Sequence, residues 1–320
     1  MTAVLVLGTT ASAAPPGIDL VRDHVELRFA DDAAAAERDI ADAEIVFAWR
    51  GDLLEGAWPH ATALRWVQSP WAGVESLLFP ALVESEVVLT NARGVFDAAV
   101  AEWTLAAVLF FAKDLGGLVE RRREHRWEPR EVELLSGRRL LVVGPGSIGR
   151  QVARAARSLG LQVRGVGRRA RTGDPVFGAI LGIDELPEAL GWADVVVNVL
   201  PATPQTERVF DVGAFAAMRP GTRFVNVGRG SAVDEDALVA ALRAGRLGAA
   251  ALGVTEVEPL PASSPLWDLP NVLLSPHSGA AFGGWREAVV ERFVENLDRF
   301  LRGAPLRGVV DKRAGFVVER

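Results

Sequence analysis

The chain has 320 residues, of which 49% are hydrophobic and 24% charged, with a net charge of −6 and no cysteine. This length predicts two domains, and the negative charge excludes a general attraction to nucleic acids or anionic membranes. Without cysteine there is no disulfide or thiolate nucleophile, and we expect no metal site. No run reaches the roughly 18 apolar residues of a membrane-spanning helix. Residues 1–16 lack the basic start and long apolar run of a signal peptide, so we expect a cytoplasmic protein.

Short apolar runs alternate with helical patterns along the chain, which is typical of an α/β protein built on parallel sheets. A long apolar helix over residues 98–118 divides the strands into two sets, and another helix over residues 284–301 lies near the end. The predicted strands are residues 4–7, 44–48, 64–67 and 87–90 in the first set, and residues 140–143, 163–166, 195–199, 224–227, 249–254 and 272–274 in the second.

The strand at 140–143 leads into Gly144-Pro-Gly-Ser-Ile-Gly149, and a helical pattern follows that ends at Gly160. In a G-x-G-x-x-G motif the first glycine allows a tight turn, the second lets the backbone approach a pyrophosphate, and the third lets helix and strand pack closely. The helix start then favours an anion. A plain structural turn is the alternative, but this setting favours a dinucleotide site. We therefore predict a dinucleotide-binding domain of residues 99–284 and a substrate domain of residues 1–98 and 285–320, with a cleft between them.

Three charged side chains directly follow successive predicted strands of the second set: Arg229, Glu258 and His277. A guanidinium can bind a carboxylate or a 2-keto acid through two hydrogen bonds. A histidine can deliver a proton near neutral pH, and a neighbouring carboxylate would keep it protonated and oriented. Each residue alone has an ordinary structural interpretation, as a surface ion pair, a solvated carboxylate or a turn cap. Together, at the ends of successive strands, they predict a catalytic site.

The strand at 163–166 ends in Arg168-Arg-Ala-Arg171, and no acidic residue follows the glycine motif before Asp174. An acidic residue about 20 positions after the motif binds the ribose 2′-hydroxyl of NAD, whereas arginine binds the 2′-phosphate of NADP. A solvated basic turn is the alternative. We predict that Arg168 and Arg169 select NADP(H), with NAD(H) as a possible second cofactor.

Further motifs are spread over nearly the whole chain, among them Gln68-Ser-Pro-Trp-Ala-Gly-Val-Glu75, Asn91-Ala-Arg-Gly-Val, Ala101-Glu-Trp-Thr, Asn198-Val-Leu-Pro-Ala-Thr-Pro-Gln-Thr206, Val227-Gly-Arg-Gly-Ser231 and Ser275-Pro-His277. With these motifs in this order, the chain resembles the NAD(P)-dependent D-isomer-specific 2-hydroxyacid dehydrogenases. That family includes glyoxylate/hydroxypyruvate reductases and the D-lactate and D-3-phosphoglycerate dehydrogenases. The resemblance implies an α/β fold with a Rossmann-type dinucleotide-binding domain and a flavodoxin-like α/β substrate domain. It also implies a homodimer formed through residues 98–137.

The resemblance implies roles for individual residues. Arg229, Glu258 and His277 form the catalytic set, and the backbone amides of Ala72 and Gly73, beside Trp71, bind the substrate carboxylate together with Arg229. The implied cofactor-binding residues are Gly144, Gly146, Ser147, Ile148, Gly149, Arg168, Arg169, Leu200, Pro201, Thr206, Val227, Gly228 and Gly279. One departure is Gly253, because the family usually has an aspartate there that helps to hold the nicotinamide carboxamide.

These features predict an NADP(H)-dependent reductase that converts small 2-keto acids, such as glyoxylate or hydroxypyruvate, to D-2-hydroxy acids. The predicted substrate domain has no basic cluster for a phosphate, although Arg50 and Arg93 are single exceptions. Three alternatives stay open: a dinucleotide-sensing scaffold with little turnover, a dehydrogenase for a bulkier 2-hydroxy acid, and one for D-3-phosphoglycerate. The matched set of acid, orienting carboxylate and guanidinium argues against the scaffold.

Overall fold

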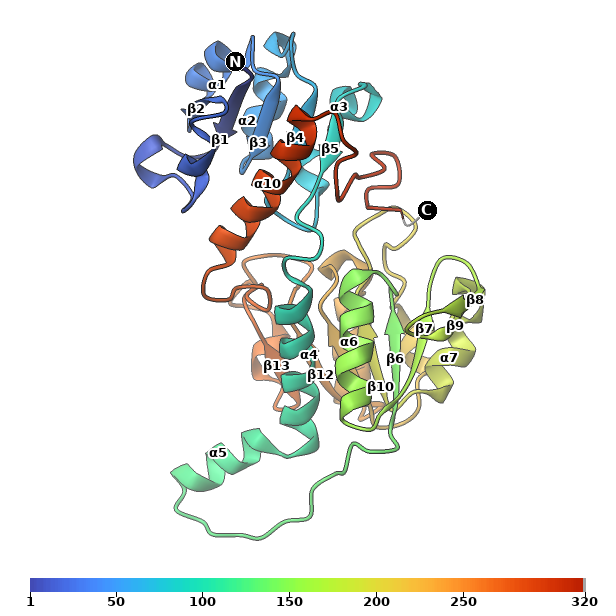
Figure 1. The fold of residues 1–320 in the computed structure, drawn as a ribbon. Helices are drawn as coiled ribbons and strands as arrows, with labels where there is room; N and C mark the ends of the chain where they lie inside the picture. The colour runs from blue at the N-terminus through green and yellow to red at the C-terminus, as the bar shows by residue number, and fades with distance from the viewer. Residues whose placement is uncertain (319–320) are drawn as a thin grey trace. The chain divides into compact units, whose positions relative to one another are not determined.

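The structure is a computed structural model that describes residues 1–318, and it contains two compact units. Unit 1 comprises Met1–Phe96 together with the chain from Phe282 onward, and unit 2 comprises Asp97–Ala281. Each unit has its own sheet (Figure 1). The chain therefore leaves unit 1 after its fifth strand and returns to it with the last helix.

Unit 1 is built on a five-stranded parallel sheet with the order β2-β1-β3-β4-β5. This order is the flavodoxin-like one, so this part of the fold prediction is confirmed. Strands β1 and β3 are buried along their whole length, because layers of helices cover a parallel sheet on both faces. The strands are β1 (Ala3–Leu7), β2 (Glu26–Ala30), β3 (Ile45–Ala48), β4 (Trp66–Gln68) and β5 (Val88–Thr90), and the helices are α1 (Ala33–Ile40), α2 (Gly51–Ala57), α3 (Pro80–Glu84) and α10 (Trp285–Leu301). Single 3-10 turns lie at Ala11–Ala13, Ile18–Val21, Trp58–His60 and Glu75–Leu77.

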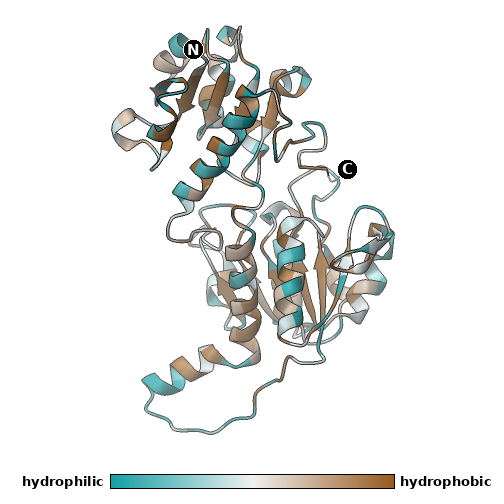
Figure 2. Ribbon diagram, in the orientation of Figure 1, coloured by the Kyte–Doolittle hydropathy of each residue, from teal (hydrophilic) through white to brown (hydrophobic). Residues whose placement is uncertain are grey.

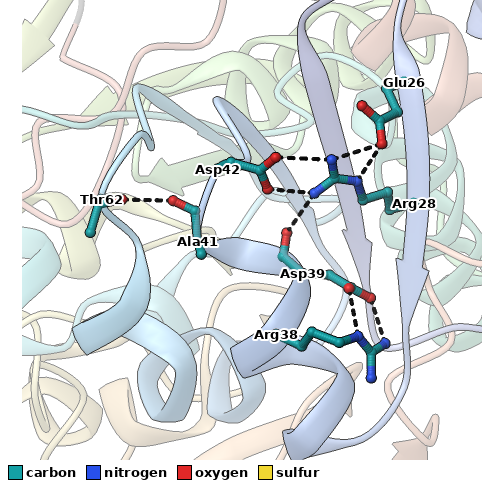
Figure 3. Close-up of polar contacts among 7 residues, drawn as sticks. All are labelled: Glu26, Arg28, Arg38, Asp39, Ala41, Asp42 and Thr62. Carbon is teal, nitrogen blue, oxygen red and sulfur yellow. Dashed lines mark hydrogen bonds and ion pairs between the residues drawn. The ribbon is translucent and has the colours of Figure 1, made fainter.

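The edge strand β2 is missing from the predicted strands because charged side chains interrupt its apolar pattern. Arg28 binds Glu26 at 2.7 Å and donates to both carboxylate oxygens of Asp42, which lies just after α1 (Figure 3). The hydrogen bonds that Arg28 donates, first to Asp42 and then to Glu26, raise the pKa of its guanidinium. A charged edge also discourages the strand from pairing with another sheet.

Unit 2 is built on an eight-stranded sheet with the order β13-β12-β11-β10-β6-β7-β9-β8. All pairs are parallel except β8 with β9, a hairpin at the edge that the sequence pattern does not predict. The strand order reverses between β10 and β7, on the two sides of β6, which is the switch point of a Rossmann-type sheet. The strands are β6 (Arg139–Val143), β7 (Gln162–Val166), β8 (Arg171–Asp174), β9 (Gly178–Leu181), β10 (Val195–Asn198), β11 (Thr222–Asn226), β12 (Leu247–Leu252) and β13 (Val272–Leu274).

Two hydrophobic cores lie on the two faces of this sheet. Leu140 and Val142 of β6 belong to the core with α4 and α6, whereas Leu141 and Val143 belong to the core with α7, α8 and α9. Alternate residues of a strand point to opposite faces, so continuous apolar strands need helices on both sides. Figure 2 shows the central strands of both sheets as apolar. The helices are α4 (Asp97–Ala112), α5 (Leu115–Arg123), α6 (Ser147–Ser158), α7 (Leu186–Trp192), α8 (Val212–Ala217) and α9 (Glu235–Arg243), with 3-10 turns at Ile183–Glu185, Gly230–Ala232 and Pro265–Asp268.

The prediction of one helix over residues 98–118 is wrong, because the chain breaks between α4 and α5. Asp114 adopts a left-handed backbone conformation with φ of 49° and caps α5 by accepting a hydrogen bond from the Gly117 amide at 3.2 Å. Its carboxylate also binds the buried Arg121 at 2.8 Å. Helix α5 and the segment that follows it extend away from the rest of unit 2 (Figure 1). Within residues 1–318, no helix has the length and apolar character needed to cross a membrane.

Candidate active site

The glycine motif connects β6 to α6, and the surroundings of each of its three glycines explain why a side chain is absent there. Gly144 has φ of 104°, and an added Cβ would lie 2.7 Å from the carbonyl oxygen of Val199. A Cβ on Gly149 would lie 2.2 Å from the Gly144 carbonyl oxygen, whereas one on Gly146 would meet no atom within 4 Å. Gly146 is therefore open on the side where a ligand would approach. No side chain caps the start of α6, so its first amides are available to an anion.

The loops that follow β10 and β11 are joined by two buried asparagines that the sequence analysis did not single out. Asn198 donates to the side-chain oxygen of Asn226 at 2.9 Å, and these residues end β10 and β11. Asn198 also accepts from the Leu200 amide, and Asn226 accepts from the Gly228 amide. The predicted cofactor residues Leu200, Pro201, Thr206, Val227 and Gly228 thus belong to two tied loops, and Thr206 donates to the Pro201 carbonyl at 2.6 Å. The sequence signal that could have identified this pair is an asparagine at the end of each of two neighbouring apolar strands, Asn198 and Asn226.

Arg229 stands between two glycines that tight packing requires. A Cβ on Gly228 would lie 2.6 Å from the Leu200 carbonyl oxygen, and a Cβ on Gly230 would lie 2.0 Å from the carbonyl oxygen of Thr255. The loop carrying Arg229 therefore touches the backbone that leads to Glu258. Arg229 is half-buried and donates from Nη1 to the Gly228 carbonyl at 2.8 Å, which directs the guanidinium back along its own loop.

Glu258 and His277 lie in direct contact, as the sequence predicts. The distance from His277 Nδ1 to Glu258 Oε2 is 2.7 Å, and Glu258 Oε1 accepts a hydrogen bond from the Thr255 amide at 3.0 Å. With Nδ1 bound to the carboxylate, the Nε2 atom is the one left to exchange a proton with a ligand. His277 has φ of 51°, a conformation that is uncommon outside glycine and is concentrated at functional sites.

A further carboxylate, Glu235, supports the loop before Glu258. It lies in the first turn of α9 and accepts a hydrogen bond from the Glu256 amide at 2.7 Å. Burial raises the pKa of Glu235, and the nearby carboxylate of Glu256 adds to the shift. The loop that carries Glu258 is thus held from two sides, by Glu235 and by the backbone around Gly230.

Arg168 and Arg169 lie directly after β7 and are exposed. Neither has an ion-pair or hydrogen-bond partner among residues 1–318. Asp174, the first acidic residue after the glycine motif, is used elsewhere: its buried carboxylate receives two hydrogen bonds from Arg150, at 2.8 and 2.7 Å. Burial opposes its ionisation, but Arg150 and the amides of residues 176 and 177 outweigh burial and hold the pKa of Asp174 far below its usual value. Asp174 is therefore not available to a ribose hydroxyl.

Gly253 and Gly279 share a neighbour, the half-buried indole of Trp103 on α4. A Cβ on Gly253 would lie 3.4 Å from the Trp103 ring and 3.2 Å from the Asn226 carbonyl oxygen. A Cβ on Gly279 would lie 3.3 Å from the same indole. Gly253, where the sequence resemblance implies an aspartate, therefore lies against an aromatic ring.

In unit 1, the loop of Trp71, Ala72 and Gly73 follows β4. The amides of Ala72 and Gly73 have no hydrogen-bond acceptor in the described part of the chain, so both donors are available to an anion. Trp71 is 42% exposed and packs against Trp49 and Trp285, with ring centroids 5.9 and 5.2 Å away. Trp127, by contrast, is 97% exposed and lies after α5. Arg50 binds Asp52, and Arg93 donates to the Val317 carbonyl.

Comparison with known proteins identifies the family. The sequence model described as "D-isomer specific 2-hydroxyacid dehydrogenase, NAD binding domain" matches residues 105–279, more than half of the chain. The chain belongs to this family. It is therefore an NAD(P)-dependent oxidoreductase with a Rossmann-like domain, as the resemblance implies.

Three relatives illustrate the match. A D-isomer specific 2-hydroxyacid dehydrogenase from Xanthobacter autotrophicus, solved with NADPH and MES, is 30% identical with a TM-score of 0.86 and covers 99% of this chain and 100% of its own. An NADPH-dependent glyoxylate/hydroxypyruvate reductase from Sinorhizobium meliloti, solved with NADP and sulfate, is 28% identical with a TM-score of 0.85 and the same coverage. A glyoxylate reductase from Thermococcus onnurineus is 29% identical over 304 residues, 90% of each chain.

Proposed function

We propose that this member of the family is an NADPH-dependent reductase of small, unphosphorylated 2-keto acids, producing D-2-hydroxy acids. The observation that carries the proposal is the 2.7 Å contact between His277 Nδ1 and Glu258, next to the loop of Arg229. It supplies a proton donor with a fixed orientation and a neighbouring guanidinium, the two groups that a keto oxygen needs as it gains negative charge.

Each residue has a proposed role in this reaction. The bound nicotinamide supplies the hydride for the keto carbon. His277 delivers a proton from Nε2 to the keto oxygen, and Glu258 holds the imidazole by its Nδ1 atom. Arg229 stabilises the negative charge that develops on that oxygen. The free amides of Ala72 and Gly73 bind the substrate carboxylate.

The cofactor preference rests on the residues that follow the glycine motif. The start of α6 offers uncapped amides for a pyrophosphate, and Arg168 and Arg169 offer two exposed guanidinium groups for a 2′-phosphate. Asp174 is held by Arg150 and cannot take the role of the acid in an NAD site. Two relatives of similar structure were solved with NADPH or NADP, which agrees with this proposal.

The proposal includes a homodimer formed by α5 and the segment up to residue 137. Large apolar side chains are exposed on this arm, and contiguous exposed apolar surface marks an interface. They are Leu115, Leu118, Val119, Trp127, Val132 and Leu134. Apart from Arg121, which is buried against Asp114, the charged run Glu120–Arg126 forms local ion pairs, such as Arg123 with Glu120 at 2.6 Å, and is proposed as the solvated face of the arm. A cytoplasmic location is also proposed, because a chain without cysteine suits a reducing compartment; cell fractionation tests it.

The test is turnover of reduced cofactor with a panel of glyoxylate, hydroxypyruvate, phenylpyruvate and 3-phosphohydroxypyruvate. We expect the two small acids to give the highest kcat/KM, and His277→Ala to lower kcat by about 10²–10⁴-fold, the usual contribution of a positioned acid. Wild-type kcat in His277→Ala would contradict the assignment. Tight NADPH binding without turnover of any acid would favour the dinucleotide-sensing scaffold instead. Preference for the phosphorylated acid would favour a D-3-phosphoglycerate dehydrogenase.

A further inference from the structure

The two free amides of the loop after β4 are oriented through their own peptide units. A trans peptide is planar, and its carbonyl and N–H point in opposite directions, so a hydrogen bond to the carbonyl fixes the direction of the N–H. The Ala72 amide shares a peptide with the Trp71 carbonyl, which accepts from the Ala92 amide at 3.0 Å. The Gly73 amide shares a peptide with the Ala72 carbonyl, which accepts from the side chain of Asn91 at 2.6 Å. Both anchors come from the segment that follows β5.

Asn91 is the one of these anchors that acts through its side chain, and it is buried, with only 4% of its surface exposed. Its Nδ2 donates to the Ala72 carbonyl, and its Oδ1 accepts from the Arg93 amide at 3.2 Å. The two contacts use opposite halves of the carboxamide. The side chain therefore has one orientation in which both are satisfied, and the Gly73 amide inherits that orientation.

The segment after α10 packs against Asn91 and hydrogen-bonds to its backbone. The Asn91 amide donates to the Gly308 carbonyl at 3.1 Å, and a bridge pairs Thr90 with Val309. Gly308 has φ of 69°, and a Cβ there would lie 2.8 Å from the Asn91 carbonyl oxygen and 3.1 Å from its Oδ1. Only glycine fits this approach without displacing Asn91.

A buried hydrogen-bond network fixes this segment and the loop to each other. Asn296 of α10 accepts from the Arg307 amide at 2.8 Å and donates to the Arg307 carbonyl at 3.0 Å. The same side chain donates to Gln68 Oε1 at 3.1 Å, and Gln68 Nε2 donates to the Ser69 carbonyl at 2.7 Å. Fully satisfied polar networks of this kind specify one arrangement.

We propose that Asn91 is a positioning residue for substrate binding, which directs the Gly73 amide at the substrate carboxylate, and that Gly308 keeps Asn91 in place. The proposal rests on the proposed function, since it takes the Ala72 and Gly73 amides as the carboxylate site. It predicts that a change behind the loop, with no contact to substrate, alters substrate binding selectively.

The test compares Asn91→Asp with Gly308→Ala. The aspartate keeps an oxygen that accepts from the Arg93 amide, but it has no donor for the Ala72 carbonyl. Its second carboxylate oxygen would instead face the Ala72 carbonyl oxygen, and the two would repel each other. Gly308→Ala keeps Asn91 and displaces it. We expect KM for the 2-keto acid to rise roughly tenfold or more in both variants, because misplacement of a binding group by about 1 Å costs up to about 100-fold. We expect KM for NADPH and kcat to change by less than about threefold.

Asn271→Asp is the matched control, because Asn271 also donates from Nδ2 to a backbone carbonyl, that of Gly248, but in unit 2. We expect it to leave KM for the 2-keto acid unchanged. Calorimetric titration of each enzyme–NADPH complex with oxamate, a carboxylate analogue, measures carboxylate binding without turnover. Should Asn91→Asp not fold, Gly308→Ala carries the test.

The outcomes separate this proposal from the proposed function. Wild-type enzyme that binds oxamate but reduces no 2-keto acid contradicts the proposed function alone, and weaker oxamate binding in the two variants would still support the role of Asn91. Unchanged KM and unchanged oxamate affinity in a folded variant overturn the positioning role. It is also overturned if KM for NADPH, kcat and melting temperature shift together, since that is the signature of a merely structural residue.

Discussion

Replacing Arg168 and Arg169 together with alanine tests how the enzyme selects its cofactor. Both guanidinium groups are exposed and have no partner among the described residues, so a 2′-phosphate would bind them without breaking an existing ion pair. A charge-assisted hydrogen bond contributes about 1.5–3 kcal/mol, or roughly ten- to a hundredfold in affinity. Because exposed charges are screened, we expect the lower part of that range from each residue. The double variant should therefore lose about ten- to a hundredfold in NADPH affinity, with NADH affinity nearly unchanged.

The assay is the Kd of each cofactor by calorimetry, together with kcat/KM for NADPH and NADH. Arg171→Ala is the control, since Arg171 is the next arginine along the chain but lies 3.6 Å from Asp174. We expect it to leave the cofactor ratio within about twofold. Added salt should weaken NADPH binding in the wild type more than in the double variant. A wild-type preference for NADH, or an equal effect of Arg171→Ala, would refute this reasoning.

Three more outcomes are expected. Trp71→Ala should raise kcat/KM for phenylpyruvate relative to glyoxylate by about tenfold or more, because it removes a half-exposed wall beside Ala72; an unchanged ratio would place Trp71 outside the substrate site. Asp174→Asn should lower the free energy of unfolding by about 3 kcal/mol at neutral pH, because it breaks a buried ion pair with Arg150. Since folding lowers the pKa of Asp174, its stabilisation is fully present above the unfolded-state pKa of about 3.9 and is lost progressively as the pH falls from there through the lower folded-state pKa, so the difference in urea midpoint between wild type and variant should narrow steadily below about pH 3.9. If the proposed homodimer forms through the arm, Leu118→Glu with Leu134→Glu should convert it to a monomer in sedimentation velocity, whereas Leu20→Glu, 77% exposed but outside the arm, should not.

The parallel strands and the contact between His277 and Glu258 could be predicted from sequence because their signals are local. A buried parallel strand is a continuous apolar run, and the G-x-G-x-x-G motif joins strand to helix within ten residues. His277 and Glu258 are 19 positions apart, but both follow strands that neighbour each other in the sheet, so the strand order brings them together. Residues placed by strand ends are predictable whenever the strands are.

The features that the sequence did not predict depend on contacts between distant segments. The charged strand β2 has no clean alternation, and its ion pair with Asp42 forms only when α1 is in place. The break at Asp114 competes with an apolar pattern that continues to Leu118, and only the cap and Arg121 decide it. The role proposed for Asn91 requires Gly308, which is far along the chain, to lie against it.

Gly253 stands at the position where the sequence resemblance implies an aspartate that helps to hold the nicotinamide. A Cβ at this position would lie 3.4 Å from the Trp103 indole and 3.2 Å from the Asn226 carbonyl oxygen. The same indole packs at Gly279, so one aromatic ring serves both glycines. Asn226 in turn holds the loop of Arg229 by donating to its carbonyl at 3.1 Å. The glycine is therefore packed against residues that hold the loop of Arg229. Because the contact between His277 and Glu258 is intact beside it, the geometry around Gly253 favours the proposed enzyme over the dinucleotide-sensing scaffold.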